Sequence, residues 1–211
     1  MSIDRLMTLK SENDSKGLEM LTEAGRFKAL ADRDNNGLKP RAISGFNLFQ
    51  TPEEVAQRMF DKIPSKYYKD LSILEPSAGL GRLYKVLLRY LPKANYTLVD
   101  NNPDCVKELY NISGAGTQII QNDFLSIEMG HLYNLIIMNP PFKMGTDIKH
   151  IKHALRFLKP GGLLVALCYN GVKQNKVLKP IADTWEVLPK NSFKSEGTAA
   201  EVVLLTIKGS N

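Results

Sequence analysis

A short apolar run that ends at two prolines restricts most strongly what this chain can fold into. Residues 135–138 read LIIM, and residues 139–142 read NPPF. A continuous apolar run of this length is typical of a strand that is buried on both faces of a parallel sheet. Proline cannot donate to a sheet ladder, so the strand has to end at Asn139. Ligands of open α/β sheets bind at the carboxyl ends of strands, which makes residues 139–142 the first candidate site.

The side chains and carbonyls of residues 139–142 suit a planar amine. The side-chain oxygen of Asn139 and the backbone carbonyl of Pro140 are two acceptors, and an exocyclic amino group offers two N–H donors. Phe142 can stack on the ring that carries the amine. Holding both hydrogens localises the nitrogen lone pair toward an electrophile, so we expect catalysis by positioning. The alternative interpretation is a tight Pro-Pro turn in which Phe142 is an ordinary core residue.

A glycine-rich turn is the second candidate site. Residues 71–74 predict a strand, residues 75–81 read EPSAGLG, and a helix is expected directly afterwards. Gly79 and Gly81 allow a backbone to approach a ligand closely. Tyr84 stands where a dinucleotide fingerprint has its third glycine. Glu75 at the strand end would repel a pyrophosphate and attract an ammonium group, so a cationic cofactor is favoured.

Two further predicted strands, over residues 96–100 and 117–120, lead to acidic residues. Asp100 lies where doubly wound folds place an acid on ribose hydroxyls. Asp123 can accept a hydrogen bond from an adenine amine, with Phe124 against the ring. Each acid taken singly is better explained as a helix cap or a loop carboxylate. Three strand ends with acids, followed by a fourth with NPPF, together indicate one shared pocket.

The other elements complete an α/β pattern. Thr51, Pro52 and Glu54 predict a helix start with Thr51 as N-cap and a capping box. Helical periodicity is also present over residues 17–33 and 147–159. Later strands are expected at residues 163–169, 185–188 and 201–207. We therefore expect an N-terminal extension over residues 1–45, partly helical, and one domain over residues 46–211.

In this order the motifs resemble those of the class I S-adenosylmethionine-dependent methyltransferases, and among them the DNA adenine-N6 enzymes. The resemblance covers about residues 46–207 and is carried by five segments: residues 49–52 (FQTP), 74–81 (LEPSAGLG), 100 (D), 122–124 (NDF) and 139–142 (NPPF). It implies a doubly wound, mostly parallel, seven-stranded Rossmann-like sheet with an antiparallel C-terminal hairpin. It also implies S-adenosylmethionine as the cofactor.

The resemblance assigns roles to individual residues. The cofactor would be held by Thr51, Glu75, Ser77, Gly79, Gly81, Asp100, Asn101, Asp123 and Phe124. Thr51, Glu75 and the Gly79–Gly81 turn would serve its methionine end, Asp100 its ribose, and Asp123 with Phe124 its adenine. The catalytic residues would be Asn139, Pro140 and Phe142. The substrate would also contact Pro141, Lys143 and Phe193, the last as an aromatic against a flipped base.

Charge and composition favour a polyanionic partner. The chain of 211 residues carries a net charge of +6. From residue 143 to residue 196 it has ten Lys or Arg and four Asp or Glu, so this segment accounts for the whole excess. This surface either contacts phosphates or is simply a solvated face. Cys105 and Cys168 form no paired motif, and we expect reduced, buried thiols.

Several classes of site and location are not expected from the sequence. His150 and His153 lack a cysteine or carboxylate partner nearby in sequence, so we expect no metal. The chain has no signal-peptide pattern and no apolar run of membrane-spanning length, so we expect no membrane partner and a cytoplasmic location.

The expected activity is methylation of adenine N6 in DNA. No segment is long enough for a separate target-recognition domain, so recognition is relaxed or a separate partner supplies it. Related NPP-aromatic motifs also occur in RNA adenine and protein glutamine methyltransferases, which remain alternatives. A non-catalytic nucleic-acid-binding or regulatory protein that keeps the fold is the alternative of another class.

Overall fold

Strands and helices alternate along the chain and build a single mixed sheet. The structure, a computed structural model, describes residues 50–67 and 71–210. The strands are β1 (Ser72–Glu75), β2 (Asn95–Asp100), β3 (Thr117–Gln121), β4 (Tyr133–Met138), β5 (Leu158–Tyr169), β6 (Thr184–Val187) and β7 (Val202–Lys208). The α-helices of the described part are α2 (Glu53–Phe60), α3 (Arg82–Tyr90), α4 (Pro103–Ile112), α5 (Thr146–Ala154) and α6 (Val172–Val177). Shorter 3₁₀ turns include η2 (Phe124–Ser126), η3 (Lys143–Gly145), η4 (Leu155–Phe157) and η6 (Lys194–Glu196).

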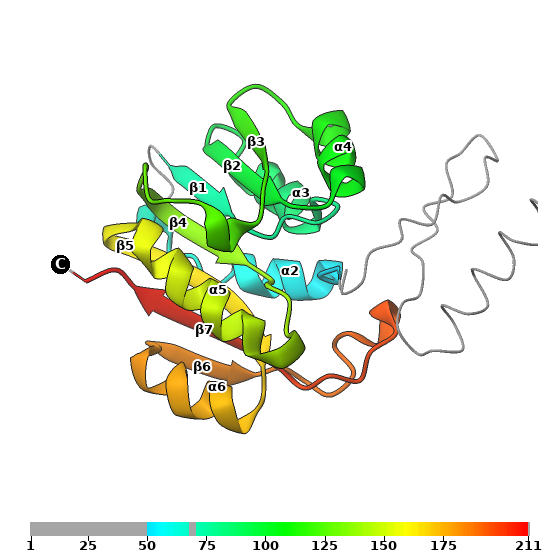
Figure 1. Cartoon of the computed structure of the whole chain (residues 1–211), viewed down its shortest axis with the longest axis vertical. Helices are drawn as coiled ribbons and strands as arrows, with labels where there is room; N and C mark the ends of the chain where they lie inside the picture. Colours follow the sequence, from blue (N-terminus) through cyan, green and yellow to red (C-terminus); the bar gives the residue numbers. More distant parts are fainter. Residues whose placement is uncertain (1–49, 68–70, 211) are drawn as a thin grey trace, which may run out of the picture.

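The seven strands have the order β3-β2-β1-β4-β5-β7-β6, which Figure 1 shows from top to bottom. Neighbouring strands from β3 to β5 pair in parallel, whereas β7 runs antiparallel to both β5 and β6. The predicted fold class, a mostly parallel sheet with an antiparallel C-terminal hairpin, is therefore confirmed.

The order in which the sheet is built creates a crevice at β1. The chain grows outward from β1 through β2 to β3, and β4 then returns to the other side of β1. Ile73 of β1 pairs with Tyr96 of β2 on one side and with Leu135 of β4 on the other. Helices that leave β1 and β4 therefore diverge, and a ligand can enter between the carboxyl ends of these strands.

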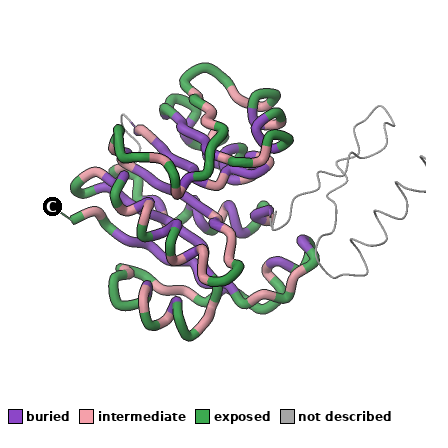
Figure 2. The backbone as a smooth tube through the Cα atoms, in the orientation of Figure 1, coloured by how far each residue is buried: buried purple, intermediate pink, exposed green. Residues whose placement is uncertain are grey.

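Both faces of the central strands are buried. Leu135 and Ile137 of β4 belong to the core on the side of α2 and α3, and Ile136 and Met138 belong to the core on the side of α5. Figure 1 shows α5 and α6 in front of the sheet and α2 and α3 behind it, and Figure 2 shows that most residues of the central strands are buried. This double burial explains the unbroken LIIM run. Cys105 and Cys168 are free and buried, as expected.

The start of α2 differs from the prediction. Pro52, and not Thr51, occupies the N-cap position, and no side chain caps the helix. Thr51 is buried, and its hydroxyl accepts a hydrogen bond from the Asn139 amide instead. The capping-box prediction from sequence was therefore wrong at this helix.

The helix expected over residues 147–159 is shorter than predicted. It ends at Ala154, continues as the turn η4, and gives way to β5 at Leu158. Leu158 pairs with Tyr133, and the register then shifts before Leu163 pairs with Leu135. Strand pairing thus overrides the helical periodicity of the last turn.

Some predictions lie outside the described residues. The helix expected over residues 17–33 and the extension over residues 1–45 both fall there, so they stay predictions. Across residues 50–67 and 71–210, no helix combines the length and apolar character that crossing a bilayer requires.

Gly81 shapes the packing of α3 against α4. Its φ is +73°, and a Cβ built on it would lie 2.5 Å from Ile112 Cδ1 and 3.0 Å from Leu109 Cδ2. We expect Gly81→Ala to lower the free energy of unfolding by about 1–3 kcal/mol, because it overpacks this contact and strains a left-handed backbone. Urea denaturation measures the change. Gly114→Ala is the matched control, because nothing lies within 4 Å of its Cβ position. Equal stability of the two variants would contradict the packing role of Gly81.

Candidate functional site

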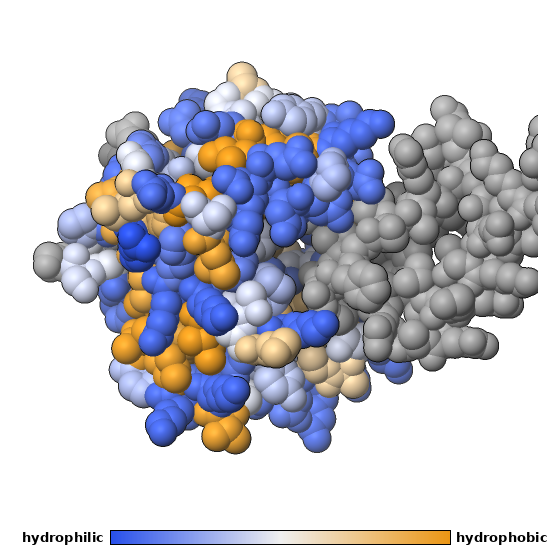
Figure 3. Space-filling view, in the orientation of Figure 1, coloured by the Kyte–Doolittle hydropathy of each residue, from blue (hydrophilic) through white to orange (hydrophobic). Residues whose placement is uncertain are grey.

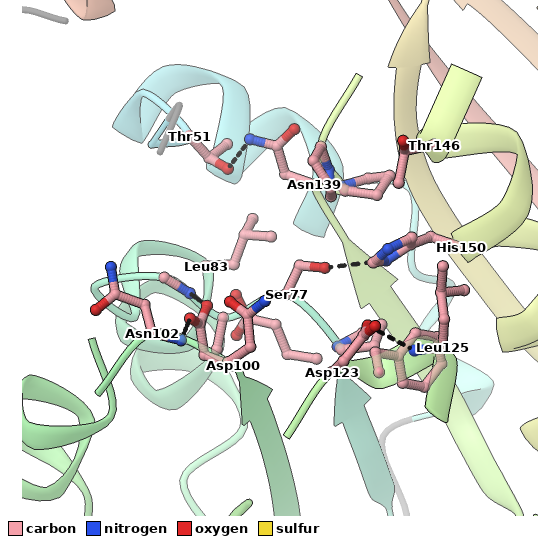
Figure 4. A pocket seen from close by; sticks show the side chains of 18 of the residues that line it. Thr51, Ser77, Leu83, Asp100, Asn102, Asp123, Leu125, Asn139, Thr146 and His150 are labelled. Carbon is pink, nitrogen blue, oxygen red and sulfur yellow. Dashed lines mark hydrogen bonds between the residues drawn. The ribbon is translucent and has the colours of Figure 1, made fainter. Parts of the chain in front are cut away.

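A cavity of about 350 Å³ lies at the carboxyl ends of the first four strands. Figure 4 shows side chains from these strand ends, from the start of α2 and from α5 pointing into it. The lining residues are Gln50, Thr51, Glu75, Pro76, Ser77, Ala78, Gly79, Arg82, Leu83, Asp100, Asn101, Asn102, Asn122, Asp123, Phe124, Leu125, Asn139, Pro140, Pro141, Phe142, Thr146 and His150. The structure therefore brings most of the predicted site residues to one cavity, which is the arrangement that the strand-end motifs indicated.

Asp100 holds the glycine-rich turn against the end of β2. Its Oδ2 accepts a hydrogen bond from the Gly79 N–H at 2.8 Å, and its Oδ1 accepts one from the Asn102 N–H at 2.9 Å. Burial raises the pKa of this carboxyl, and the hydrogen bonds from Asn102 and Gly79 oppose that shift. The conformation of the turn and the position of Asp100 therefore depend on each other.

Glu75 leaves a buried carboxylate oxygen without a protein partner. Its side chain is 1% exposed, and Oε2 has no hydrogen-bond partner among the described residues. Burial raises the pKa of Glu75 well above its usual range, and the nearby Asp100 raises it further. An unpaired buried acceptor costs free energy unless it is protonated or meets a donor. The cavity therefore has a place for a cationic, hydrogen-donating group at Glu75.

The amide of Asn139 is oriented from the other side of the cavity. Its Nδ2 donates a hydrogen bond to Thr51 Oγ1 at 3.1 Å, as Figure 4 shows. This bond fixes the amide nitrogen toward Thr51 and turns the amide oxygen in a different direction. Phe142 is half-buried, lines the cavity and packs against the core on the side of α2 and α3. Its ring is thus positioned by packing and is still available at the cavity wall.

The segment after β3 forms another wall of the cavity. Asp123 is exposed, and its carboxylate accepts a hydrogen bond from the Leu125 N–H at 3.0 Å. Phe124 is 3% exposed, and its ring packs edge-on against His153 at a centroid distance of 4.8 Å. The cavity is therefore lined here by one carboxylate and one fixed aromatic ring.

His150 is a site residue that the sequence analysis missed. It is 7% exposed, lines the cavity, and its Nδ1 lies 3.5 Å from Ser77 Oγ. Burial lowers its pKa, which Asp123 opposes and His153 reinforces. Thr146 also lines the cavity and lies four residues earlier on α5, so both residues share one face of the helix. This spacing, directly after the NPPF segment, is a signal that could have identified them.

Two other cavity residues have partners in distant segments. Gln50 Oε1 accepts a hydrogen bond from the Leu80 N–H at 3.3 Å, and its amide fills the space beside Gly79. Arg82 Nη1 lies 4.0 Å from an oxygen of the buried Glu196. Neither contact has a local sequence signal, because the partners are far apart along the chain.

Three predicted site residues are not among those that line the cavity. Gly81 makes room for α4, as described above. Lys143 is exposed. Phe193 is 1% exposed and belongs to the core on the side of α2 and α3. The protein's own side chains cover the ring of Phe193 in this structure, and its contact with a flipped base stays a prediction.

No metal-binding cluster accompanies the cavity. Within the part of the chain that the structure describes, no group of three or more His, Cys, Asp or Glu side chains could hold a metal ion.

Comparisons with known proteins identify the family. A family model described as the methyltransferase small domain matches residues 54–194. A curated relative, the type II methyltransferase M.CvrRI of Paramecium bursaria Chlorella virus XZ-6E, is 23% identical over an alignment of 195 residues that covers 81% of this chain and 50% of the relative. The chain therefore spans about half the length of that relative.

Solved structures show the same fold. A candidate class I S-adenosylmethionine-dependent methyltransferase from Listeria monocytogenes matches with a TM-score of 0.61 and 20% identity, covering 80% of this chain and 63% of that one. A type I restriction-modification methyltransferase subunit from Streptococcus thermophilus matches with a TM-score of 0.63 and 16% identity, covering 79% and 47%. A candidate RNA methyltransferase from Pyrococcus horikoshii matches with a TM-score of 0.61 and 13% identity, covering 80% and 91%.

The family match, the strand order and the cavity at the carboxyl ends of the strands agree with one another. The chain therefore belongs to the methyltransferase small domain family, and its fold is that of a candidate class I S-adenosylmethionine-dependent methyltransferase.

Proposed function

We propose that the protein transfers the methyl group of S-adenosylmethionine to the exocyclic N6 amine of adenine in DNA. The observation that carries this proposal is the shared cavity. Acidic side chains at the ends of β1 and β2 and after β3 line it together with the Asn139–Phe142 segment at the end of β4. An arrangement that holds a cationic donor next to a group that binds a planar amine is what such a transfer requires.

The cavity fits the cofactor at three points. The unpartnered Oε2 of Glu75 suits the ammonium of its methionine part. Asp100 would accept from the ribose hydroxyls, and Asp123 with Phe124 would hold the adenine. Ser77, Gly79 and Asn101 also line the cavity and would complete this binding surface. When bound, S-adenosylmethionine supplies an electrophilic methyl group on a sulfonium.

Asn139, Pro140 and Phe142 would hold the target base. The Asn139 amide oxygen and the Pro140 carbonyl would accept the two N–H bonds of the amine, and Phe142 would stack on the ring. Accepting both hydrogens concentrates the nitrogen lone pair on the side that faces the cofactor. The amine must leave the base stack to reach this segment, so the adenine would be flipped out of its helix. Pro141 lines the same wall, and Lys143 follows on the exposed side.

Three observations support DNA as the polymer. The curated relative is a type II methyltransferase, and one structural neighbour is a subunit of a restriction-modification system. The net charge of +6 suits a polyanion. We also propose that a separate partner supplies sequence recognition to the methyltransferase domain over residues 46–211.

The direct test is parallel transfer of tritiated methyl groups to DNA, RNA and protein, followed by nucleoside and amino-acid analysis. We expect labelled N6-methyladenine in DNA. Label in RNA adenine, or in protein glutamine, would replace the DNA proposal with that alternative. Cofactor binding without label in any polymer would instead support a regulatory protein that keeps the fold.

Asn139→Ala tests the proposed amine acceptor. We expect the rate of methyl transfer to fall by about 10²–10³-fold, because an oriented acceptor is lost at the reacting nitrogen. Cofactor affinity, measured by isothermal titration calorimetry, should stay close to that of the wild type. Unchanged turnover would remove the acceptor role.

Thr51→Val tests whether Thr51 acts through Asn139. The variant keeps the side-chain shape and loses the hydroxyl that accepts from Asn139 Nδ2. We expect kcat to fall by about two- to tenfold, the range of one hydrogen bond. Thr51→Ser, which keeps the hydroxyl, should restore most of the rate. If Thr51→Val keeps the wild-type rate and Thr51→Ser loses it, the methyl group of Thr51 and not its hydroxyl is what matters.

Glu75→Gln tests the cation site through pH. The raised pKa keeps Glu75 protonated in the free protein above the usual glutamate range, and a bound ammonium favours the ionised form. Binding then releases a proton, so wild-type affinity for S-adenosylmethionine should rise with pH, by up to about tenfold per pH unit, until Glu75 ionises in the free protein.

The Gln variant should bind weakly and lack this component of the pH dependence. Glu128→Gln changes an exposed carboxylate outside the cavity and is the control. A wild-type affinity that is flat over the pH range above the usual glutamate pKa would contradict the role of Glu75.

A further inference from the structure

Met144 combines two unfavourable features directly after the NPPF segment. Its backbone has φ 57° and ψ 24°, in the left-handed region, and its side chain is 89% exposed. Among the described residues, Asn191 is the other non-glycine residue with a positive φ, and asparagine tolerates that conformation. Both the strained backbone and the exposure of a large apolar side chain to water cost free energy, and no contact within the described part of the fold offsets this cost. Such outliers point to a function outside the fold.

A second exposed apolar side chain follows the neighbouring strand. Val172 begins α6 and is 87% exposed, and Tyr169 at the end of β5 is 43% exposed. Strands β4 and β5 are parallel, and Met138 pairs with Ala166 near their carboxyl ends. The segments that carry Met144 and Val172 therefore leave the same edge of the sheet, which is the edge of the cavity.

A buried carboxylate connects these two segments. Asp147 is 0% exposed and accepts hydrogen bonds from the Tyr169 N–H at 2.9 Å and from Gln174 Nε2 at 3.0 Å. It lies three residues after Met144, and Gln174 lies two residues after Val172. The hydrogen bonds of Asp147 therefore link the two segments that carry the exposed side chains of Met144 and Val172. Figure 3 shows the face over α5 and α6, where hydrophilic side chains surround scattered hydrophobic ones.

Lysines accompany both apolar side chains. Lys143 precedes Met144 and Lys173 follows Val172, and both lysines are exposed. Neither takes part in an ion pair with another residue of the described chain. Apolar side chains flanked by uncompensated cations complement a partner that alternates stacked bases with phosphates. Because these side chains lie beside the cavity of the proposed methyl transfer, a nucleic acid that brings its base into the cavity explains their position better than a membrane or an acidic peptide does.

We propose that Met144 and Val172 form an apolar wedge that packs against the base pairs next to the target adenine and supports its extrusion from duplex DNA, while Lys143 and Lys173 contact the flanking phosphates. This inference rests on the proposed function and adds to it which residues open the duplex. Duplex opening by apolar side chains requires unstacking, and the energy comes from the contacts that the opened site makes.

The test compares a duplex with its single strand. Met144→Asn removes the apolar side chain and introduces a residue type that keeps the left-handed backbone. Initial rates are measured on a duplex oligonucleotide that the wild type methylates and on the single strand that contains the same adenine. We expect the duplex rate to fall at least about tenfold, because extrusion is hindered, and the single-strand rate to stay within about twofold. Val172→Ser should change the two rates in the same direction.

The control variant is Met129→Asn, since Met129 is 54% exposed and precedes the amino end of β4, at the opposite edge of the sheet. Its two rates should equal those of the wild type. Thermal unfolding and calorimetric binding of S-adenosylmethionine confirm that each variant is folded. Fluorescence of 2-aminopurine at the target position should rise with the wild type and less with Met144→Asn.

The outcomes separate this inference from the proposed function. If wild-type protein methylates the duplex and Met144→Asn does so equally well, the wedge is refuted and the proposed function stands. Equal losses on duplex and single strand also refute the wedge, because they indicate a role after extrusion. If wild-type protein transfers no methyl group to DNA, the proposed function itself fails.

Discussion

Burial of the central strands on both faces decides where polar chemistry can occur in this chain. From Leu135 to Met138, the side chains of β4 alternate between two apolar cores, so no polar group fits along this part of the strand. Functional side chains are therefore confined to the strand ends and to the loops that follow. The order β3-β2-β1-β4 then places four such ends side by side at the switch point. The cavity is a direct result of this confinement.

Within the cavity, electrostatics and packing have different roles. Glu75 is buried with one oxygen unpartnered, so this end of the cavity is prepared for positive charge. The Asn139–Phe142 end carries no ionised group and offers hydrogen-bond acceptors and an aromatic face. Asp100 also has a structural role, because its carboxylate accepts a hydrogen bond from the Gly79 N–H and so holds the glycine-rich turn. In the proposed reaction, charge would hold the cofactor and geometry would hold the acceptor.

Local patterns predicted most of this arrangement, and long-range partners account for the errors. The LIIM run predicted β4, and the acids after the predicted strands predicted which residues meet in the cavity. Thr51 was assigned to a helix cap, because a capping signal is local, whereas its actual partner Asn139 is 88 residues away. The burial of Phe193 was not predicted, because sequence does not reveal which aromatic side chains the core covers. His150 was missed, since it was judged only as a metal ligand and not by its spacing from Thr146 on α5.

The hydrogen bonds of Asp147 have a consequence for how this surface behaves in salt. Its partners are the backbone N–H groups of Ile148 and Tyr169 and the amide of Gln174, all of them uncharged. Dissolved ions screen attractions between exposed charges and leave such buried contacts almost unaffected. Raising the ionic strength should therefore weaken the proposed contacts of Lys143 and Lys173 with phosphates without changing the spacing of the segments that carry these lysines. The protein would lose affinity in concentrated salt while keeping the shape with which it meets its partner.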